Sequence, residues 1–338
     1  MPDSVYQFSL PPSLIAQTPA VPRDSSRLLV IDKHTGKLTH HIFRSLPRLL
    51  RPSDVLVFNN SAVFPARLHA VKPTGGKVEI LLLKNIKKNL WEVISHPGIK
   101  PGQHLSFSSQ LSAAVVSATS VEFSVSGSDL SVPALINRIG STPLPPYIHY
   151  SAPESLLRRQ YQTVYAKASG SAAAPTAGLH FTPRLLSRLS AKGIQLEYVT
   201  LHVGLGTFKP PTKDQITAGV LHSEWFTLSP DTADHLNAAK SAGRRVIAVG
   251  TTTTRVLESC AHPSGRLAPQ TGETNIFIRP PYKFRFVDGL ITNFHLPGSS
   301  LLMLVSAFTS PQIIRSVYRT AVKNRYRFFS FGDACLFT

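Results

Sequence analysis

The sequence predicts an α/β protein in which a mixed α/β sheet domain is interrupted by an inserted antiparallel β-barrel domain. Three observations predict this fold class. Short apolar strands alternate with helices at both ends of the chain, whereas the region between holds closely spaced strand-like segments and no long helix. Apolar residues make up 42% of the 338 residues, enough to bury a core without disulfides. We expect residues 1–62 and 149–338 to form one discontinuous α/β domain, and residues 63–148 to form the barrel.

The predicted insertion differs from its flanks in the spacing of its strands. Before it, residues 27–32 and 54–59 are apolar segments typical of buried strands. Strand-like segments separated by Gly, Pro, Asn and Ser then begin near residues 66, 77, 90, 104, 113 and 121. Such short spacing is typical of an antiparallel barrel or sandwich. A short helix over 130–140 and the proline-rich segment 142–148 close the insertion.

After residue 150 the chain alternates helices and strands. Thr182 and Ser229 each precede a proline, which is typical of an N-cap followed by the first helical position. Gly193 and Gly243 end these two helices. Further strands are expected over 194–203, 244–250 and 289–296, and further helices over 252–261, 299–308 and 311–325. This alternation indicates a mainly parallel or mixed sheet covered on both faces.

The chain is strongly basic, with 36 Lys and Arg against 18 Asp and Glu and a formal net charge of +18. Such a balance suits a polyanionic partner such as nucleic acid, although a basic composition shared by a whole lineage would also explain it. Two predicted helices carry basic stripes opposite their apolar faces: Arg184, Arg188 and Lys192, and Arg315, Arg319 and Lys323. A stripe of this kind is usually a solvated face. Because few acidic residues are present to pair with these cations, contact with phosphate is as much expected as a solvated face.

Several classes of protein are excluded by the composition. No apolar stretch approaches the roughly 18 residues of a membrane span, so we expect no membrane partner. The N-terminal residues lack the basic and apolar regions of a secretory signal. Two cysteines without CxxC spacing predict neither a zinc cluster nor a disulfide framework, and favour a cytoplasmic location.

Polar side chains of the kinds that bind ligands gather where predicted strands end, in segments 57–68, 174–182, 200–210, 248–259 and 292–300. Ligands of open α/β sheets bind outside the carboxyl ends of the strands, where such segments converge. A single histidine in such a segment is more often structural than catalytic. The histidines here have no close ligand spacing, so we expect no metal. Four threonines that open the helix after residue 250 either bind a carboxylate or ribose or simply cap the helix.

These segments, together with 144–148, 161–166, 222–226 and 331–337, resemble the S-adenosylmethionine:tRNA ribosyltransferase-isomerase family of queuosine biosynthesis. The likeness covers nearly the whole chain in order, and its most specific motifs are APTAGLHFT (174–182), LHVGLGTF (201–208) and NFHLPGSSLLMLVSAF (293–308). The resemblance also implies a mixed α/β domain interrupted by an antiparallel barrel. The chain departs from the family pattern at residues 155–159, Pro281 and Cys335, which bears on local loop geometry and tRNA contacts.

By resemblance, the enzyme transfers the ribosyl part of S-adenosylmethionine to 7-aminomethyl-7-deazaguanine at the wobble position of tRNA. The ribose is isomerised, which gives epoxyqueuosine-tRNA and releases adenine and methionine. The expected partners are therefore this tRNA and S-adenosylmethionine, which is a consumed ribosyl donor rather than a true cofactor. We expect a cytoplasmic monomer that needs no metal.

This reaction requires particular groups at its site. The sulfonium acidifies the ribose C5′ hydrogens, so a base is needed, and the departing adenine needs a general acid. We expect His180, His202, His222 and Glu224 to include both, with their order open. Trp225, next to Glu224, suits the sulfonium. The expected substrate-binding residues are Asn59, Thr252 and Asn293 for the ribose hydroxyls and Arg67 or Arg255 for the methionine carboxylate, together with Thr251 and His295.

Two other classes of protein stay open at this point. A different S-adenosylmethionine enzyme, such as a tRNA methyltransferase, would normally carry a glycine fingerprint, but Lys209 replaces its third glycine here. A non-catalytic RNA-binding protein built on the barrel would explain the charge. It would not explain why His, Asn, Thr and Glu gather at the ends of strands.

Overall fold

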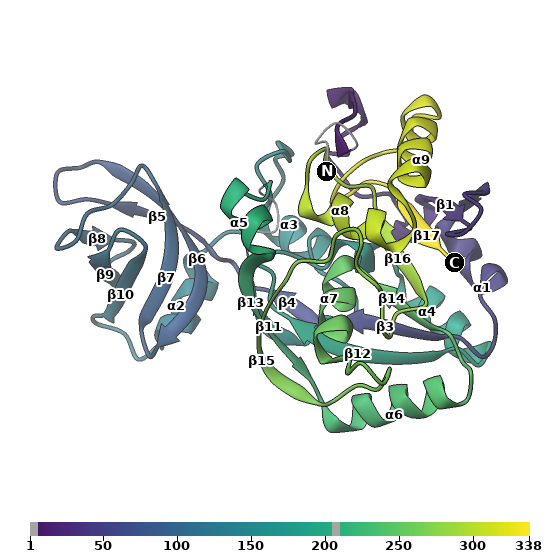
Figure 1. The fold of residues 1–338 in the computed structure, drawn as a ribbon. Helices are drawn as coiled ribbons and strands as arrows, with labels where there is room; N and C mark the ends of the chain where they lie inside the picture. Colours follow the sequence, from purple (N-terminus) through teal and green to yellow (C-terminus); the bar gives the residue numbers. More distant parts are fainter. Residues whose placement is uncertain (1–5, 205–209) are drawn as a thin grey trace.

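The computed structural model describes residues 6–204 and 210–338, and these form a nine-stranded mixed sheet and a closed six-stranded barrel (Figure 1). The predicted fold class is confirmed. The barrel consists of β5 (Arg67–Val71), β6 (Lys77–Lys87), β7 (Leu90–His96), β8 (His104–Ser106), β9 (Leu111–Ser117) and β10 (Ser120–Val125). It stands to one side of the sheet, and its strands all come from the part of the chain predicted as an insertion. The domain bounds at residues 63 and 148 stay a prediction.

The sheet draws its strands from both sides of the barrel in sequence. They are β1 (Arg27–Ile31), β2 (Leu38–Ile42), β3 (Val55–Asn59), β12 (Gln195–Leu201), β13 (Val220–Leu228), β14 (Val246–Val249), β15 (Gln270–Ile276), β16 (Gly289–Asn293) and β17 (Ala334–Phe337). Their order is β15-β13-β12-β3-β14-β16-β17-β1-β2. The four neighbours β12, β3, β14 and β16 run parallel, so their carboxyl ends lie along one edge of the sheet. A small parallel pair, β4 (Ser61–Val63) and β11 (Ala168–Ser171), extends the structure beyond this edge.

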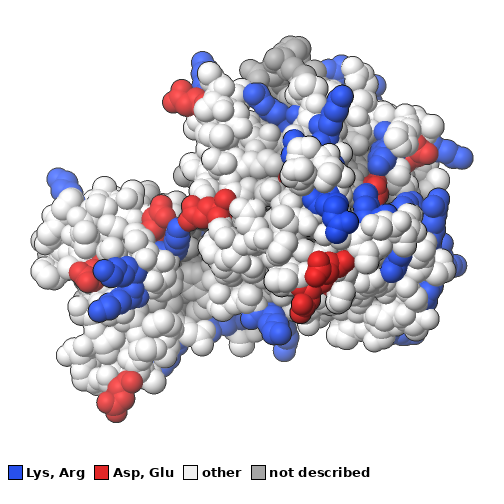
Figure 2. All heavy atoms as spheres, turned by 60° about the horizontal axis from the view of Figure 1, so that its bottom comes forward, with Lys and Arg blue, Asp and Glu red and all other residues white. Residues whose placement is uncertain are grey.

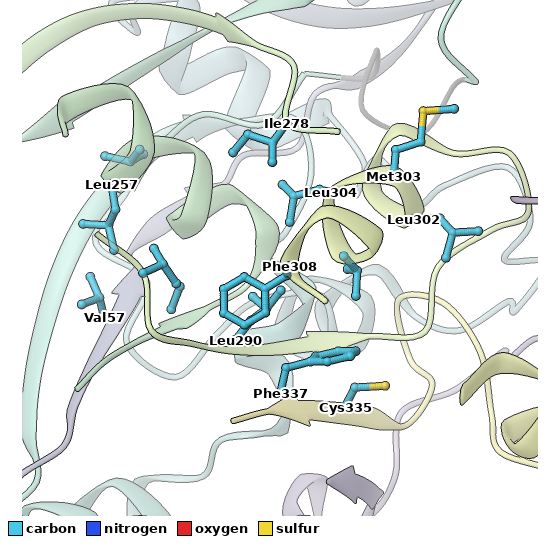
Figure 3. Close-up of a cluster of buried hydrophobic side chains, with 14 of the residues drawn as sticks. Val57, Leu257, Ile278, Leu290, Leu302, Met303, Leu304, Phe308, Cys335 and Phe337 are labelled. Carbon is cyan, nitrogen blue, oxygen red and sulfur yellow. The ribbon is translucent and has the colours of Figure 1, made fainter. Parts of the chain in front are cut away.

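Helices cover both faces of the sheet because alternate residues of its strands are apolar on each side. Val55 and Val57 of β3 face one cluster, and Leu56 and Phe58 face the other. The first cluster includes residues of α6 (Pro230–Ser241), α7 (Thr251–Cys260), α8 (Ser300–Phe308) and α9 (Pro311–Lys323). The second includes residues of α1 (Leu46–Leu49) and α4 (Pro183–Ala191). Figure 3 shows side chains of α7, α8, β16 and β17 meeting in the first cluster.

The predicted helix ends are confirmed in α4 and α6. The Thr182 hydroxyl accepts a hydrogen bond from the Leu185 amide at 3.1 Å, and the Ser229 hydroxyl accepts one from Thr232 at 3.3 Å. Gly193 follows α4 with a φ of 89°, a conformation that residues with a side chain rarely adopt. Short helices at other positions are α3 (Glu154–Gln160) and α5 (Lys213–Ala218).

The barrel has its own core, and α2 (Val132–Ile139) contributes residues to it. Leu68, Ile80 and Phe123 of the strands pack with Leu135 and Ile136 of this helix. Gly140 follows α2 at a point of close approach, where a Cβ would lie 2.1 Å from the Pro65 carbonyl oxygen. The glycine therefore allows the end of α2 to pack on the segment that enters the barrel.

Two parts of the sheet go beyond the sequence prediction. The last strand, β17, lies between β16 and β1, antiparallel to the former and parallel to the latter. Strands β13 and β15 form an antiparallel pair that extends the sheet from β12 toward the barrel. Neither β17 nor this pair was predicted, yet β13 supplies several residues of the cavity described below.

Among the described residues no single helix is long and apolar enough to cross a membrane. Only α8 and α9 taken together reach that length and hydrophobicity, and they are bent by 115° at the break between them.

Candidate active site

A cavity of about 840 Å³ lies between the barrel and the β13–β15 side of the sheet. Its barrel wall is formed by residues of β6, β7 and α2, and its sheet wall by residues of β11, β13 and the chain after β12. Lys84 of β6 and Glu273 of β15 form an ion pair across it, and Ser223 donates a hydrogen bond to the same carboxylate at 2.7 Å. The cavity is thus bounded by both parts of the molecule.

Four of the predicted site residues line this cavity: His202, His222, Glu224 and Trp225. The backbone pairing of two strand ends brings them together, because the His202 amide donates to the Trp225 carbonyl at 2.9 Å. The His202 ring stacks on Trp225, with centroids 4.9 Å apart and an interplanar angle of 18°. The structure therefore brings these four residues together at one cavity, and their catalytic and binding roles stay predictions.

The position of His202 depends on Gly170 of β11, a residue that the sequence did not single out. Gly170 has a φ of 142°, and a Cβ at this position would lie 2.7 Å from Nε2 of His202. Partial burial lowers the pKa of His202, so its imidazole is neutral near pH 7. Its Nδ1 atom is buried and has no hydrogen-bond partner among the described residues. A neutral imidazole held beside a cavity can accept or pass on a proton.

Glu224 and Arg255 are directed at each other. Both side chains are about 4% exposed, and Nη1 of Arg255 on α7 pairs with Oε2 of Glu224. The other oxygen of Glu224 accepts a hydrogen bond from the Gly204 amide at 2.9 Å. The pair thus anchors the chain at Gly204. Residues 205–209 of the predicted segment 200–210 lie outside the described residues. The catalytic role of Glu224 and the carboxylate-binding role of Arg255 stay predictions.

Asn59, at the end of β3, is completely buried and joins three elements. Its Nδ2 donates to the Leu201 carbonyl at 2.9 Å and to the Thr252 hydroxyl at 3.2 Å. Its Oδ1 accepts from the amides of Ser61 and Leu201. These bonds fix the ends of β3 and β12 and the start of α7, so Asn59 organises the edge at which the cavity lies. Its predicted contact with ribose is untested.

Thr251, Thr252 and His295 come together at a smaller cavity of about 40 Å³. Nε2 of His295 is 2.9 Å from the Thr292 hydroxyl, and burial lowers the pKa of His295 to about 3. Asn293 lines a neighbouring cavity of about 40 Å³ that also includes His295. Its Nδ2 donates to the Phe329 carbonyl, while its buried Oδ1 has no partner among the described residues.

Two predicted site residues lie elsewhere. His180 ends the 3-10 helix Thr176–His180, where its Nδ1 is 2.8 Å from the Ser26 hydroxyl and its ring stacks on Phe43. Burial, with a smaller contribution from Arg327, lowers its pKa to about 3. Arg67 belongs to the barrel, where it donates to the Leu144 carbonyl at 2.9 Å and pairs with Glu79. The lining residues described for the large cavity include neither side chain.

The two basic stripes differ in how many of their charges face solvent. In α9, Arg315, Arg319 and Lys323 are all exposed. In α4, Arg184 and Arg188 are exposed, but Lys192 is half-buried and donates to the Leu50 carbonyl at 2.7 Å. Figure 2 shows Lys and Arg side chains gathered over the larger lobe, with few Asp or Glu among them. The phosphate contacts predicted for both stripes stay predictions.

Several lining residues were missed because nothing local marks them as functional. Phe64 and Trp91 form an aromatic pair on the barrel wall, with ring centroids 5.8 Å apart. In the sequence, Trp91 only contributes to a barrel strand. Only the composition could have drawn attention to Trp91, because tryptophan is rare in this chain: it has two, and both line this cavity. Among residues 6–204 and 210–338, no group of three or more His, Cys, Asp or Glu could hold a metal ion.

This fold and this cavity define an α/β enzyme whose candidate active site lies between a sheet and an inserted barrel. The chain belongs to the queuosine biosynthesis protein family, whose model matches residues 3–337. It is 47% identical over 342 residues to the S-adenosylmethionine:tRNA ribosyltransferase-isomerase of Symbiobacterium thermophilum. It is 49% identical over 338 residues to the enzyme of the same name from Carboxydothermus hydrogenoformans, and both alignments cover 98% of each chain.

A solved structure leads to the same family. The chain is similar to the S-adenosylmethionine tRNA ribosyltransferase of Thermotoga maritima, with a TM-score of 0.58 and 36% sequence identity. The match covers 99% of this chain and 100% of the other. The predicted family and the predicted enzyme class, a transferase-isomerase of queuosine biosynthesis, are confirmed.

Replacement of His180 by Gln should make the protein less sensitive to acid. The unfolded chain binds a proton on His180 below its ordinary pKa near 6.5, whereas the native site does so only near pH 3. Stability is therefore lost as the pH falls through this window, and His180 accounts for about 2 kcal/mol of the loss between pH 7 and 5. Urea unfolding of His180→Gln at both pH values should show a loss smaller by that amount. The exposed His104→Gln variant is the control, and equal losses in all three proteins would contradict the prediction.

Proposed function

We propose that this enzyme transfers and isomerises the ribosyl moiety of S-adenosylmethionine onto 7-aminomethyl-7-deazaguanine at the wobble position of tRNA. The products are epoxyqueuosine-tRNA, adenine and methionine. The observation that carries the proposal is the cavity between the barrel and the sheet, in which two histidines, a stacked tryptophan and several carboxylates meet. Family membership supports the same reaction, because the named relatives are S-adenosylmethionine:tRNA ribosyltransferase-isomerases. We also propose that the protein works as a cytoplasmic monomer without a metal.

The chemistry of the cavity suits a sulfonium donor. Aromatic faces and carboxylates both stabilise a cation, and Trp225 and Glu273 lie on the sheet side of this cavity. Its volume of about 840 Å³ is within the usual range for a ligand site, and it is roomy for one small molecule. The cavity can therefore hold the donor with space beside it for an acceptor group.

Proton transfer in this scheme is carried by His202 and His222. One imidazole takes a proton from C5′ of the donor ribose, which leaves a carbanion stabilised by the sulfonium. The other gives a proton to adenine as the bond from C1′ to its ring nitrogen breaks. The lowered pKa of His202 supports the role of base, since the residue is already neutral at physiological pH. His180 is less well suited, because its ring is packed against Phe43.

The remaining predicted residues support the site in two ways. Thr251 and Thr252, at the start of α7, and His295 surround the smaller cavity and are proposed to bind the ribose or the methionine carboxylate. Asn59 holds these elements in place through its four hydrogen bonds. Arg255 acts through Glu224, and so contributes to the position of the sheet wall.

Mass spectrometry of the RNA product tests the proposed reaction. The full chain is incubated with S-adenosylmethionine and an anticodon stem-loop that carries 7-aminomethyl-7-deazaguanine. We expect the nucleoside to gain the mass of the rearranged ribosyl group while free adenine and methionine accumulate. In His202→Gln, single-turnover release of adenine should fall by about 100-fold or more, the usual contribution of general acid–base catalysis.

Exposed His235 provides the matched control, because His235→Gln removes an imidazole that pairs with Glu197 away from the cavity. An unchanged nucleoside mass in the wild type would overturn the proposed reaction. Formation of S-adenosylhomocysteine would instead indicate a methyltransferase. A near-normal rate in His202→Gln would remove His202 from the proton-transfer step.

The basic stripes are tested through the salt dependence of RNA binding. Each lost phosphate contact lowers the slope of log K against log salt by about 0.7 to 0.9. Arg184→Gln/Arg188→Gln and Arg315→Gln/Arg319→Gln should each bind tRNA more weakly, with a slope smaller by about 1.4 to 1.8. Lys77→Gln/Lys100→Gln removes the same charge from exposed barrel positions and serves as the control. A stripe whose variant behaves like this control does not contact phosphate.

A further inference from the structure

The two walls of the large cavity differ in chemistry. The sheet wall carries the imidazoles of His202 and His222, with Trp225 stacked on the former. The barrel wall carries no imidazole among its described lining residues. It offers instead an aromatic pair, Phe64 and Trp91, and polar side chains of the amide and carboxylate types.

Trp91 is held as a platform rather than packed fully into a core. It is half-buried at the start of β7 and its ring lies at 45° to that of Phe64. Its Nε1 is buried but has no hydrogen-bond partner among the described residues. A buried indole N–H usually finds a partner, so its lack of one at a cavity wall points to a ligand with an acceptor atom.

The polar residues beside Trp91 match the edge of a guanine-like base. Asn85 and Asn137 have amides that can both donate and accept, and the Glu92 carboxylate can accept from ring and exocyclic N–H groups. Lys87 and Lys88 are exposed where β6 turns into β7, next to this wall. Base stacking, base-edge bonds and nearby cations are the features by which proteins bind a single-stranded nucleotide.

We propose that the barrel wall is the acceptor subsite, where the 7-deazaguanine base of the RNA stacks on Trp91 while the donor lies against the sheet wall. This inference rests on the proposed function and adds to it the place of each substrate. The wobble nucleotide belongs to a loop, so it can leave the stack and enter a cavity at modest cost. The aminomethyl group would then face the ribose across the gap between the two walls.

The two tryptophans make this division measurable, because each wall holds one of them. In Trp225→Phe, emission comes from Trp91 alone and reports on the barrel wall. In Trp91→Phe, it comes from Trp225 alone and reports on the sheet wall. We expect the stem-loop RNA to quench Trp91 in a saturable way, and S-adenosylmethionine alone to quench Trp225 but leave Trp91 nearly unchanged.

Kinetics provide an independent readout. Trp91→Ala should raise the KM for the RNA by about five- to 150-fold, the usual range for loss of one base–aromatic stack, with little change in the KM for S-adenosylmethionine. The matched control is Phe107→Leu, which alters an aromatic side chain of the barrel that packs on Phe123. Because both substitutions touch the barrel, their circular dichroism melts are compared first, and Trp91→Leu replaces Trp91→Ala if the latter unfolds.

Three outcomes would overturn the assignment. RNA quenching of Trp225 but not of Trp91 would place the base on the sheet wall. Quenching of Trp91 by S-adenosylmethionine alone would place the donor on the barrel wall. Equal KM values for RNA in the wild type and in Trp91→Ala, or in Trp91→Leu if it is used instead, would remove Trp91 from the contact. If wild-type enzyme still forms the product in any of these cases, only the subsite assignment fails; if it forms none, the proposed reaction fails as well.

Discussion

The buried amide of Asn59 is the interaction on which the arrangement of the site depends. The chain leaves the sheet at this residue to form β4 and the barrel, and it rejoins the sheet next to β3 only at β12. Asn59 bonds to both backbone groups of Leu201 and to Thr252, so it fixes where the two parallel strands end and where α7 begins. Without it, several buried polar groups would lose their partners, at a cost of about 1–3 kcal/mol for each unsatisfied group. The cavity, the strand β13 and the approach of the barrel all build on this junction.

Three buried or partly buried histidines, His180, His202 and His295, differ in their surroundings although burial affects their pKa values in the same direction. Burial lowers the pKa of His180, His202 and His295 alike, and all three are neutral near pH 7. His180 and His295 have hydrogen-bond partners on neighbouring hydroxyls, whereas His202 lies over Trp225 at a large cavity. Geometry therefore separates the proposed catalytic imidazole of His202 from the imidazoles of His180 and His295, and protonation state does not. The net charge of +18 is compatible with a site that holds neutral and acidic groups, because the cations of both basic stripes lie mainly on the surface.

Structural elements that depend on residues close together in the sequence could be predicted, whereas those that depend on contacts between distant parts of the chain could not. The N-caps at Thr182 and Ser229 and the buried strand β3 depend on residues a few positions apart, and all were predicted. Strand β17 could not be, because its place depends on β1 and β16, and β1 lies about 300 residues away in sequence. His180 and His202 both lie in predicted polar segments and could not be told apart from the sequence. The contacts of His180 with Ser26 and Phe43, which are distant in sequence, determine where its ring lies. Trp91 was missed because its role arises only where the barrel meets β13 and β15.

A crystal structure of the full chain with S-adenosylmethionine, in the absence of RNA, would test the location of the site most directly. We expect electron density for the donor in the cavity between the barrel and the sheet, with the ribose next to His202 and the sulfonium near Trp225. Density for the donor at another place, such as the groove of about 420 Å³ between Phe8 and α9, would contradict this location of the active site.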